Sequence, residues 1–95
     1  MNIEASNAII RGLKAAGVDL VAILPDHGFD KVQKSIAEDP GFTFVPVSNE
    51  GIGVGICAGA FFGGKTPALM IPTSGLLVAT WPLASLNNLW NIPLL

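Results

Sequence analysis

The sequence has 95 residues, of which 51% are hydrophobic and 13% are charged, and its formal net charge is -2. This length suffices for one small domain, and the negative charge argues against nucleic-acid binding, which requires a basic surface. Charged residues make up about a quarter of a typical soluble domain. We therefore expect the chain to bury apolar surface against another chain or a missing segment.

Helical and strand patterns alternate along the first half of the chain. Apolar residues at helical spacing predict a helix over residues 4–16, which Gly17 ends. The apolar run Val18–Leu24 predicts a strand that is buried on both faces. The turn residues Pro25–Gly28 then lead into a short amphipathic helix, which Asp39-Pro40-Gly41 ends.

The alternation continues in the second half. Phe42–Val47 predicts a strand, Glu50–Gly63 a glycine-rich helix and Ala68–Ile71 a third strand. Trp81–Trp90 predicts another helix, and Ile92–Leu95 predicts the opening of a fourth strand. This order predicts an α/β fold with a parallel sheet between two helical layers. Because a finished domain rarely ends on a bare core strand, we expect a truncated domain or a chain that a partner completes.

The uncharged second half raises the question of a membrane segment. Residues 66–95 carry no charge, but prolines and asparagines interrupt them repeatedly, which argues against a spanning helix. Met1–Glu4 lack the basic and apolar regions of a signal peptide, so we expect a cytoplasmic protein. Cys57 is the single cysteine, which excludes an internal disulfide and a cysteine-based metal site. We expect Cys57 to be a buried structural thiol.

Glu50 is the main candidate for chemistry because Lys65 is the only charged residue between Gly51 and Leu95. Glu50 follows a predicted strand, at the edge where parallel sheets bind ligands. The helix that it begins contains glycines that each cost roughly 1 kcal/mol relative to alanine. Tight helix packing and close approach of a flat ligand or another backbone both explain them. Their spacing matches neither a dinucleotide-binding fingerprint nor a phosphate-binding loop.

Two further pairs of polar residues follow predicted strands. Asp26 and His27 follow the first strand, and Thr73 and Ser74 follow the third at the same edge. His27 is the only histidine and is a candidate acid or base near neutral pH, the alternative being an ordinary turn histidine. The two hydroxyl groups can hold a polar ligand. No His-Asp pair accompanies Ser74, so a nucleophilic triad is not predicted.

The segment Phe44–Ala60, with Glu50 ahead of its Gly/Ala-rich run, resembles the pyrimidine-binding domain of thiamine diphosphate enzymes. Gly63–Leu69, Thr73–Leu76 and Pro82–Asn87 continue the resemblance. Within that superfamily the sequence is most similar to alpha subunits of sulfopyruvate decarboxylase, with phosphonopyruvate decarboxylases next. The resemblance implies a three-layer parallel-sheet fold, of which residues 1–95 form part, cut off after the start of the fourth strand.

The resemblance also implies roles for individual residues. Glu50 would hydrogen-bond the N1′ atom of the cofactor's aminopyrimidine ring and so activate thiamine diphosphate. Pro25, Thr73 and Ser74 would contact the cofactor as well. Asp26, His27 and Ser74 would face the substrate, with proton transfer by His27 as a hypothesis.

The sequence contains no Gly-Asp-Gly motif, with which these enzymes bind Mg²⁺ and the diphosphate. The resemblance therefore implies a separate diphosphate-binding beta subunit that holds the metal, in a heteromeric enzyme. The implied reaction is decarboxylation of a 2-oxo acid, from 3-sulfopyruvate to sulfoacetaldehyde and CO2. A phosphonopyruvate decarboxylase, an acetolactate synthase-like carboligase and a non-catalytic association domain remain the alternatives.

Overall fold

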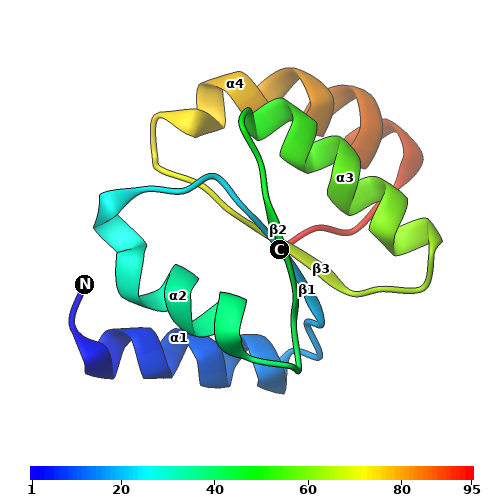
Figure 1. Ribbon diagram of the computed structural model, residues 1–95. Helices are drawn as coiled ribbons and strands as arrows, with labels where there is room; N and C mark the ends of the chain where they lie inside the picture. Colours follow the sequence, from blue (N-terminus) through cyan, green and yellow to red (C-terminus); the bar gives the residue numbers. More distant parts are fainter.

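The computed structural model describes all 95 residues, which form alternating helices and strands (Figure 1). The elements are α1 (Ile3–Ala15), β1 (Leu20–Ile23), η1 (His27–Phe29), α2 (Asp30–Glu38), β2 (Thr43–Pro46), α3 (Glu50–Phe62), β3 (Pro67–Met70), α4 (Gly75–Pro82) and η2 (Leu83–Asn88). The short η1 is a 3₁₀ helix, and η2 continues α4 as a π-helix. The predicted alternation of helices and strands is confirmed.

The three strands form a parallel sheet in the order β2-β1-β3, so β1 is the central strand. All four residues of β1 are buried, as its continuous apolar run predicted. Hydrogen bonds continue past the strand ends, from Leu24 N to Met70 O at 3.0 Å and from Val47 N to Ile23 O at 2.8 Å. These bonds hold the carboxyl ends of all three strands together at one edge.

Helices α1 and α2 cover one face of the sheet (Figure 1). The larger hydrophobic cluster fills the space beneath them and consists of Leu13, Val18, Val21, Ile23, Val32, Ile36, Phe42 and Ala68. Lys14 Nζ lies 2.8 Å from Asp39 Oδ2, which ties the end of α1 to the residue after α2. The hydrogen bond from Lys14, helped by the Gly41 N–H, holds the pKa of the Asp39 carboxyl below its ordinary value.

Helices α3 and α4 cover the opposite face of the sheet. The smaller cluster on this side contains Ala22, Val47 and Cys57. Because side chains alternate along a strand, β1 presents the small Ala22 here and the larger Val21 and Ile23 to the first face. Two helical layers around one parallel sheet give the predicted three-layer α/β architecture. No helix in the structure combines the length and hydrophobicity that crossing a bilayer requires.

The start of the predicted helix Trp81–Trp90 is wrong. The helical segment begins six residues earlier, at Gly75, and Pro82 lies inside it rather than in its first turn. Proline lacks the N–H that an interior helical position needs, and π-helical bonding over Leu83–Asn88 follows immediately. Pro82 therefore marks a change of helical pitch and not a helix start.

The predicted fourth strand at Ile92–Leu95 is not formed. Asn91 adopts a φ of 54°, which turns the chain back toward the sheet. Leu69 N then donates to Leu95 O at 2.9 Å, beside the outer edge of β3. A strand requires a ladder of such bonds, so this segment borders the sheet without joining it.

Candidate functional site

Three loops meet at the carboxyl edge of the sheet and carry the polar residues that the sequence singled out. Pro25, Asp26 and His27 follow the central strand β1, Glu50 follows β2, and the Thr73-Ser74 pair follows β3. Since β1 lies between the other strands, its loop lies between the other two loops. Ligands of open α/β sheets bind at this edge.

Glu50 is the first residue of α3, where local hydrogen bonds define the helix start. Asn49 Oδ1 accepts from Gly51 N at 2.7 Å and from Ile52 N at 3.2 Å, and so caps the helix. A carboxylate in the first turn also interacts favourably with the helix dipole. The Glu50 side chain is only 8% exposed, yet its carboxylate has no hydrogen-bond or ion-pair partner within the chain. The carboxylate oxygens keep contact with solvent, unlike the buried and unpartnered Ser6 Oγ and Asn87 Oδ1, and are therefore open to a ligand.

Helix α4 packs closely on the beginning of α3 through two glycines. A Cβ atom on Gly75 would lie 2.6 Å from Glu50 Cγ, well inside van der Waals contact. A Cβ atom on Gly51 would lie 3.4 Å from Pro82 Cγ and 3.6 Å from Val78 O. The absence of these two side chains allows the helices to approach each other around Glu50.

The loop after β1 surrounds a cavity of about 210 Å³, which is lined by Pro25, Asp26, His27 and Gln33. Asp26 Oδ2 accepts from Gly28 N at 2.8 Å, and Asp26 N donates to Gln33 Oε1 at 3.3 Å. These bonds fix the backbone of the loop. His27 is exposed, and its imidazole makes no hydrogen bond to the rest of the chain.

The sequence-predicted site residues therefore fall into two groups. Pro25, Asp26 and His27 share the cavity, whereas Glu50 and the Thr73-Ser74 pair do not line it. Thr73 and Ser74 are exposed, and Ser74 occupies the N-cap position of α4 without forming a side-chain capping bond. Their hydroxyl groups are free to bind a ligand at the sheet edge.

Gln33 and Gly75 are two residues of this region that the candidate list from the sequence omitted. Gln33 lies on α2, seven positions from the Asp26 backbone that it contacts. Polar residues on amphipathic helices usually face solvent, so its position in the sequence gave no signal. Gly75 lies in a segment that carried the family resemblance, but its contact with Glu50 is visible only after folding.

Cys57 is 1% exposed, which confirms the prediction of a buried thiol. Its Sγ donates to the Ala68 carbonyl at 3.7 Å across the α3–β3 contact. Burial raises the pKa of the Cys57 thiol from 9.0 to about 11, against a smaller opposing contribution from the Ala22 backbone. Because the thiolate is the nucleophilic form, Cys57 is a structural residue.

Cationic groups are absent from the 210 Å³ cavity, since its four lining residues include no lysine or arginine. Lys65 lies just before β3, which places it at the opposite, amino edge of the sheet. The structure also contains no group of three or more His, Cys, Asp or Glu residues that could hold a metal ion.

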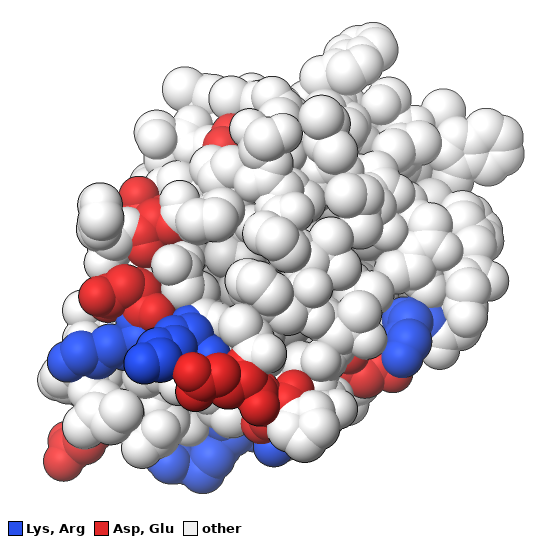
Figure 2. Space-filling model, in the orientation of Figure 1, with Lys and Arg blue, Asp and Glu red and all other residues white.

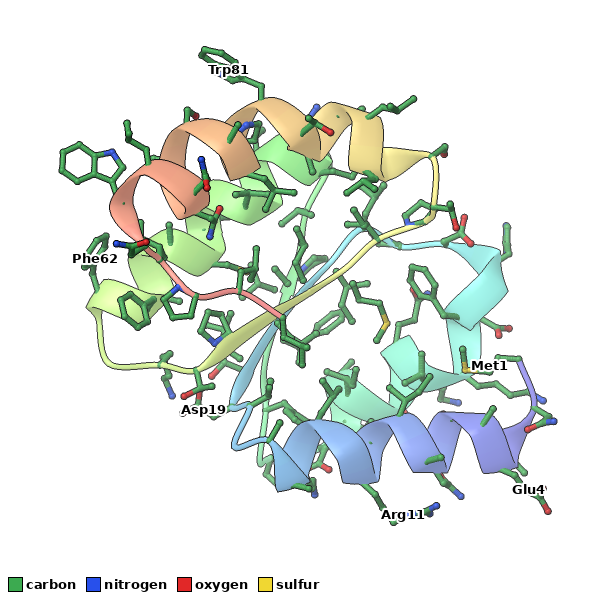
Figure 3. All side chains as sticks on the ribbon, turned by 180° about the vertical axis from the view of Figure 1, so that it is seen from behind. Met1, Glu4, Arg11, Asp19, Phe62 and Trp81 are labelled. Carbon is green, nitrogen blue, oxygen red and sulfur yellow. The ribbon has the colours of Figure 1, made fainter.

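Large apolar side chains are exposed over α3, α4 and the residues that follow η2. We call this set the α3–α4 apolar surface; it comprises Ile52, Ile56, Phe61, Phe62, Leu76, Leu77, Val78, Trp81, Leu89 and Trp90. Figure 2 shows charged residues gathered over α1 and α2, whereas the region over α3 and α4 is almost uncharged. Trp81 and Phe62 project outward from their helices (Figure 3). Apolar patches of this kind mark interaction sites.

Comparison with known proteins identifies relatives along nearly the whole chain. The sequence is 37% identical to sulfopyruvate decarboxylase subunit alpha of Methanothermobacter thermautotrophicus over 94 residues, 99% of this chain. The chain is homologous to sulfopyruvate decarboxylase alpha subunits. It spans about half the length of these relatives, 57% of the Methanothermobacter protein. No family model matches the sequence.

Two longer relatives are also similar. Sulfopyruvate decarboxylase of Methanosarcina acetivorans is 33% identical over 97% of this chain, which covers 23% of that protein. Phosphonopyruvate decarboxylase of Streptomyces viridochromogenes is 32% identical over 90% of this chain, which covers 21% of that protein. Sulfopyruvate decarboxylase alpha subunits therefore match this chain with higher identity than the phosphonopyruvate enzyme does.

Proposed function

We propose that this chain supplies the pyrimidine-binding part of a thiamine diphosphate-dependent decarboxylase. The substrate class is a small 2-oxo acid, and the similarity to sulfopyruvate decarboxylase subunits favours conversion of 3-sulfopyruvate to sulfoacetaldehyde and CO2. The enzyme would act as a complex with a second subunit. The lower identity to the phosphonopyruvate enzyme makes phosphonopyruvate the second substrate to test.

The observation that carries this proposal is the placement of Glu50, which is mostly buried at the sheet edge while its solvent-accessible carboxylate has no partner in the chain. A ligand that covers this carboxylate removes its remaining water, which is costly unless the ligand supplies a hydrogen-bond donor. A protonated ring nitrogen of a bound heterocycle is such a donor, and Glu50 lies at the sheet edge where ligands bind. The residues present thus fit a role in holding the aminopyrimidine of thiamine diphosphate.

The cofactor, when bound, supplies the nucleophilic carbon and accepts the electrons released as CO2 leaves. Glu50 holds the ring and exchanges a proton with its nitrogen. Pro25, Thr73 and Ser74 line the same sheet edge, where they offer a rigid apolar wall and two free hydroxyl groups to the cofactor or substrate. These residues orient the reactants, whereas the cofactor accepts the electrons of the reaction.

The loop after β1 is the proposed substrate-facing element. His27 is exposed on the 210 Å³ cavity, and an imidazole can transfer a proton near neutral pH. Asp26 acts mainly on the loop itself, because its carboxylate accepts from Gly28 N. An acidic side chain repels an acidic substrate, so the cation that neutralises the second acid group must come from outside this cavity.

A partner subunit completes the proposed site. The chain has no Gly-Asp-Gly motif and no acidic cluster for Mg²⁺, so the partner would hold the metal and diphosphate. The relatives' designation as alpha subunits supports a partner. So does the Methanosarcina protein, which is more than twice as long as these subunits. The α3–α4 apolar surface is the proposed docking face.

The test compares Glu50→Gln with the wild-type chain, each reconstituted with a candidate beta subunit, Mg²⁺ and thiamine diphosphate. Glutamine keeps the shape of the side chain but cannot carry the charge or accept the proton. We expect turnover of 3-sulfopyruvate to fall about 100-fold or more, as sulfoacetaldehyde formation would show. Glu38→Gln at the exposed end of α2 is the matched control and should retain activity. Near-full activity of Glu50→Gln would refute the proposed role.

A non-catalytic association module is the second candidate, and the exposed α3–α4 apolar surface favours it. In that case the chain would bind the beta subunit, but Glu50→Gln would change neither binding nor any activity of the complex. Product analysis with pyruvate tests the carboligase alternative, because acetolactate would then form in place of an aldehyde.

A further inference from the structure

Gly75 begins α4 directly against the Glu50 side chain. A Cβ atom at this position would lie 2.6 Å from Glu50 Cγ, 2.8 Å from Cδ and 3.2 Å from Oε2. The first of these is the shortest distance of its kind for any glycine in the chain. Carbon atoms in favourable contact are about 3.5–4.0 Å apart, so no side chain fits here unless Glu50 moves.

Glycine is required at this position because there is no room for a Cβ atom, and not because of the backbone conformation. Positive φ values occur only at Gly17, Gly64 and Asn91, so the Gly75 backbone is open to any residue. Gly75 also lies in a helix, where alanine is the better former. The three atoms that a Cβ would meet all belong to Glu50. The local structure therefore favours alanine in every respect except its contact with one side chain.

Packing against Gly75 is what orients the Glu50 carboxylate, because no hydrogen bond within the chain does so. Both residues are buried where the first turns of α3 and α4 meet. We propose that Gly75 is a positioning residue for Glu50, whose carbon chain lies on the bare Gly75 backbone with its carboxylate held at the sheet edge. The catalytic consequence rests on the proposed function, whereas the packing relationship does not.

A double-mutant cycle in thermal stability tests the packing relationship without any activity measurement. Gly75→Ala should lower the Tm of the chain in the wild-type background and leave it unchanged in the Glu50→Ala background, where Cγ and Cδ are gone. Gly12→Ala on α1, where a Cβ meets nothing within 4 Å, is the control and should not depend on Glu50. If Gly75→Ala prevents folding, Glu50→Ala should restore it. Equal losses in both backgrounds, or no rescue, would overturn the proposal.

The catalytic consequence is tested in the complex with the beta subunit, Mg²⁺, thiamine diphosphate and 3-sulfopyruvate. Gly75→Ala should lower kcat about 100-fold through displacement of Glu50, with KM for the substrate unchanged. Deuterium exchange at C2 of thiamine diphosphate should slow in parallel, which a loss of folded enzyme alone would not produce once rates are scaled to bound cofactor. Unchanged kcat and exchange would overturn the positioning role. If Glu50→Ala itself proves fully active, the proposed function fails, and the stability cycle still decides whether Gly75 positions Glu50.

Discussion

At the scale of single residues, two buried ionisable groups on α3 differ in what surrounds them. The Cys57 thiol lies among Ala22, Val47 and the Ala68 carbonyl, and this packing accounts for its protonated, unreactive state. Glu50 lies two turns earlier on the same face of α3, at the open edge of the sheet, and its carboxylate lacks a partner. The first arrangement is complete within the chain, whereas the second leaves a carboxylate open to a ligand. This contrast supports the role proposed for Glu50.

Ionisation of Cys57 gives a pH-dependent stability. The thiol ionises with a pKa of 9.0 in the unfolded chain and about 11 in the folded protein. Between these values the unfolded state releases a proton that the native state retains, so the free energy of unfolding falls as pH rises from about 9 to about 11. Urea titrations at several pH values should show a steeper decline for the wild type than for Cys57→Ala. Equal slopes for the two chains would contradict the raised pKa.

At the scale of elements, α3 combines a buried face with an exposed face that also contains glycine. A Cβ on Gly53 would lie 2.7 Å from Leu69 Cδ1, so this glycine allows α3 to approach the sheet. Gly55 and Gly59 are exposed, and a Cβ on either would meet nothing within 4 Å. Packing inside the chain therefore explains Gly53 but leaves Gly55 and Gly59 unexplained. Close approach of the proposed partner's backbone is the explanation that we test for them.

Alanine substitutions separate these two groups of glycines. Gly55→Ala and Gly59→Ala should each stabilise the isolated chain by about 0.5–1 kcal/mol, because alanine has the higher helix propensity. Gly53→Ala should gain less, since Leu69 must move. Urea unfolding measures the stability, and titration calorimetry with the beta subunit measures binding. We expect the two exposed substitutions to weaken binding while they raise stability; unchanged affinity would remove the partner explanation.

At the scale of the whole molecule, charge and apolar surface are segregated. The radius of gyration is 12.7 Å, close to the roughly 12 Å expected for a folded domain of this size. The exposed apolar residues are therefore not the result of an open, unpacked chain. Most of them lie over α3 and α4, the layer that contains Glu50, whereas charged residues cover α1 and α2 (Figure 2). This polarity gives the domain one charged face and one apolar face, and the apolar face is the proposed docking surface.

Charge placed on the apolar face should weaken association without loss of fold. Leu77 is 84% exposed and Trp81 78% exposed, so neither contributes much to the packed core. Leu77→Lys combined with Trp81→Lys should leave Tm nearly unchanged and lower affinity for the beta subunit at least about tenfold. Ile3→Lys is the control, because it places the same charge on an exposed apolar residue of α1, away from the proposed interface. Self-association or binding that survives the double substitution, measured by sedimentation velocity, would place the interface elsewhere.

Local patterns in the sequence determined the α/β alternation and the position of Glu50 at a sheet edge. The buried strand β1, the stop at Gly17 and the glycine-rich α3 all depend on residues close together in the chain, so periodicity and turn residues reveal them. The start of α4 was mispredicted because the change of helical pitch after Pro82 depends on tertiary packing. The fourth strand was mispredicted for the same reason, since pairing beside β3 depends on how the chain packs.

Only the tertiary structure decided which residues surround the site. Gly75 meets Glu50 across 25 positions of sequence, and Gln33 reaches the Asp26 backbone from another helix. It also decided that most of the exposed apolar residues lie together on one side, since α3 and α4 pack on the same face of the sheet. The physical reason is that periodicity records which face of an element is apolar, whereas contacts between elements depend on how they pack. The sequence by itself identified the carboxylate, and the packing of α4 determined its orientation.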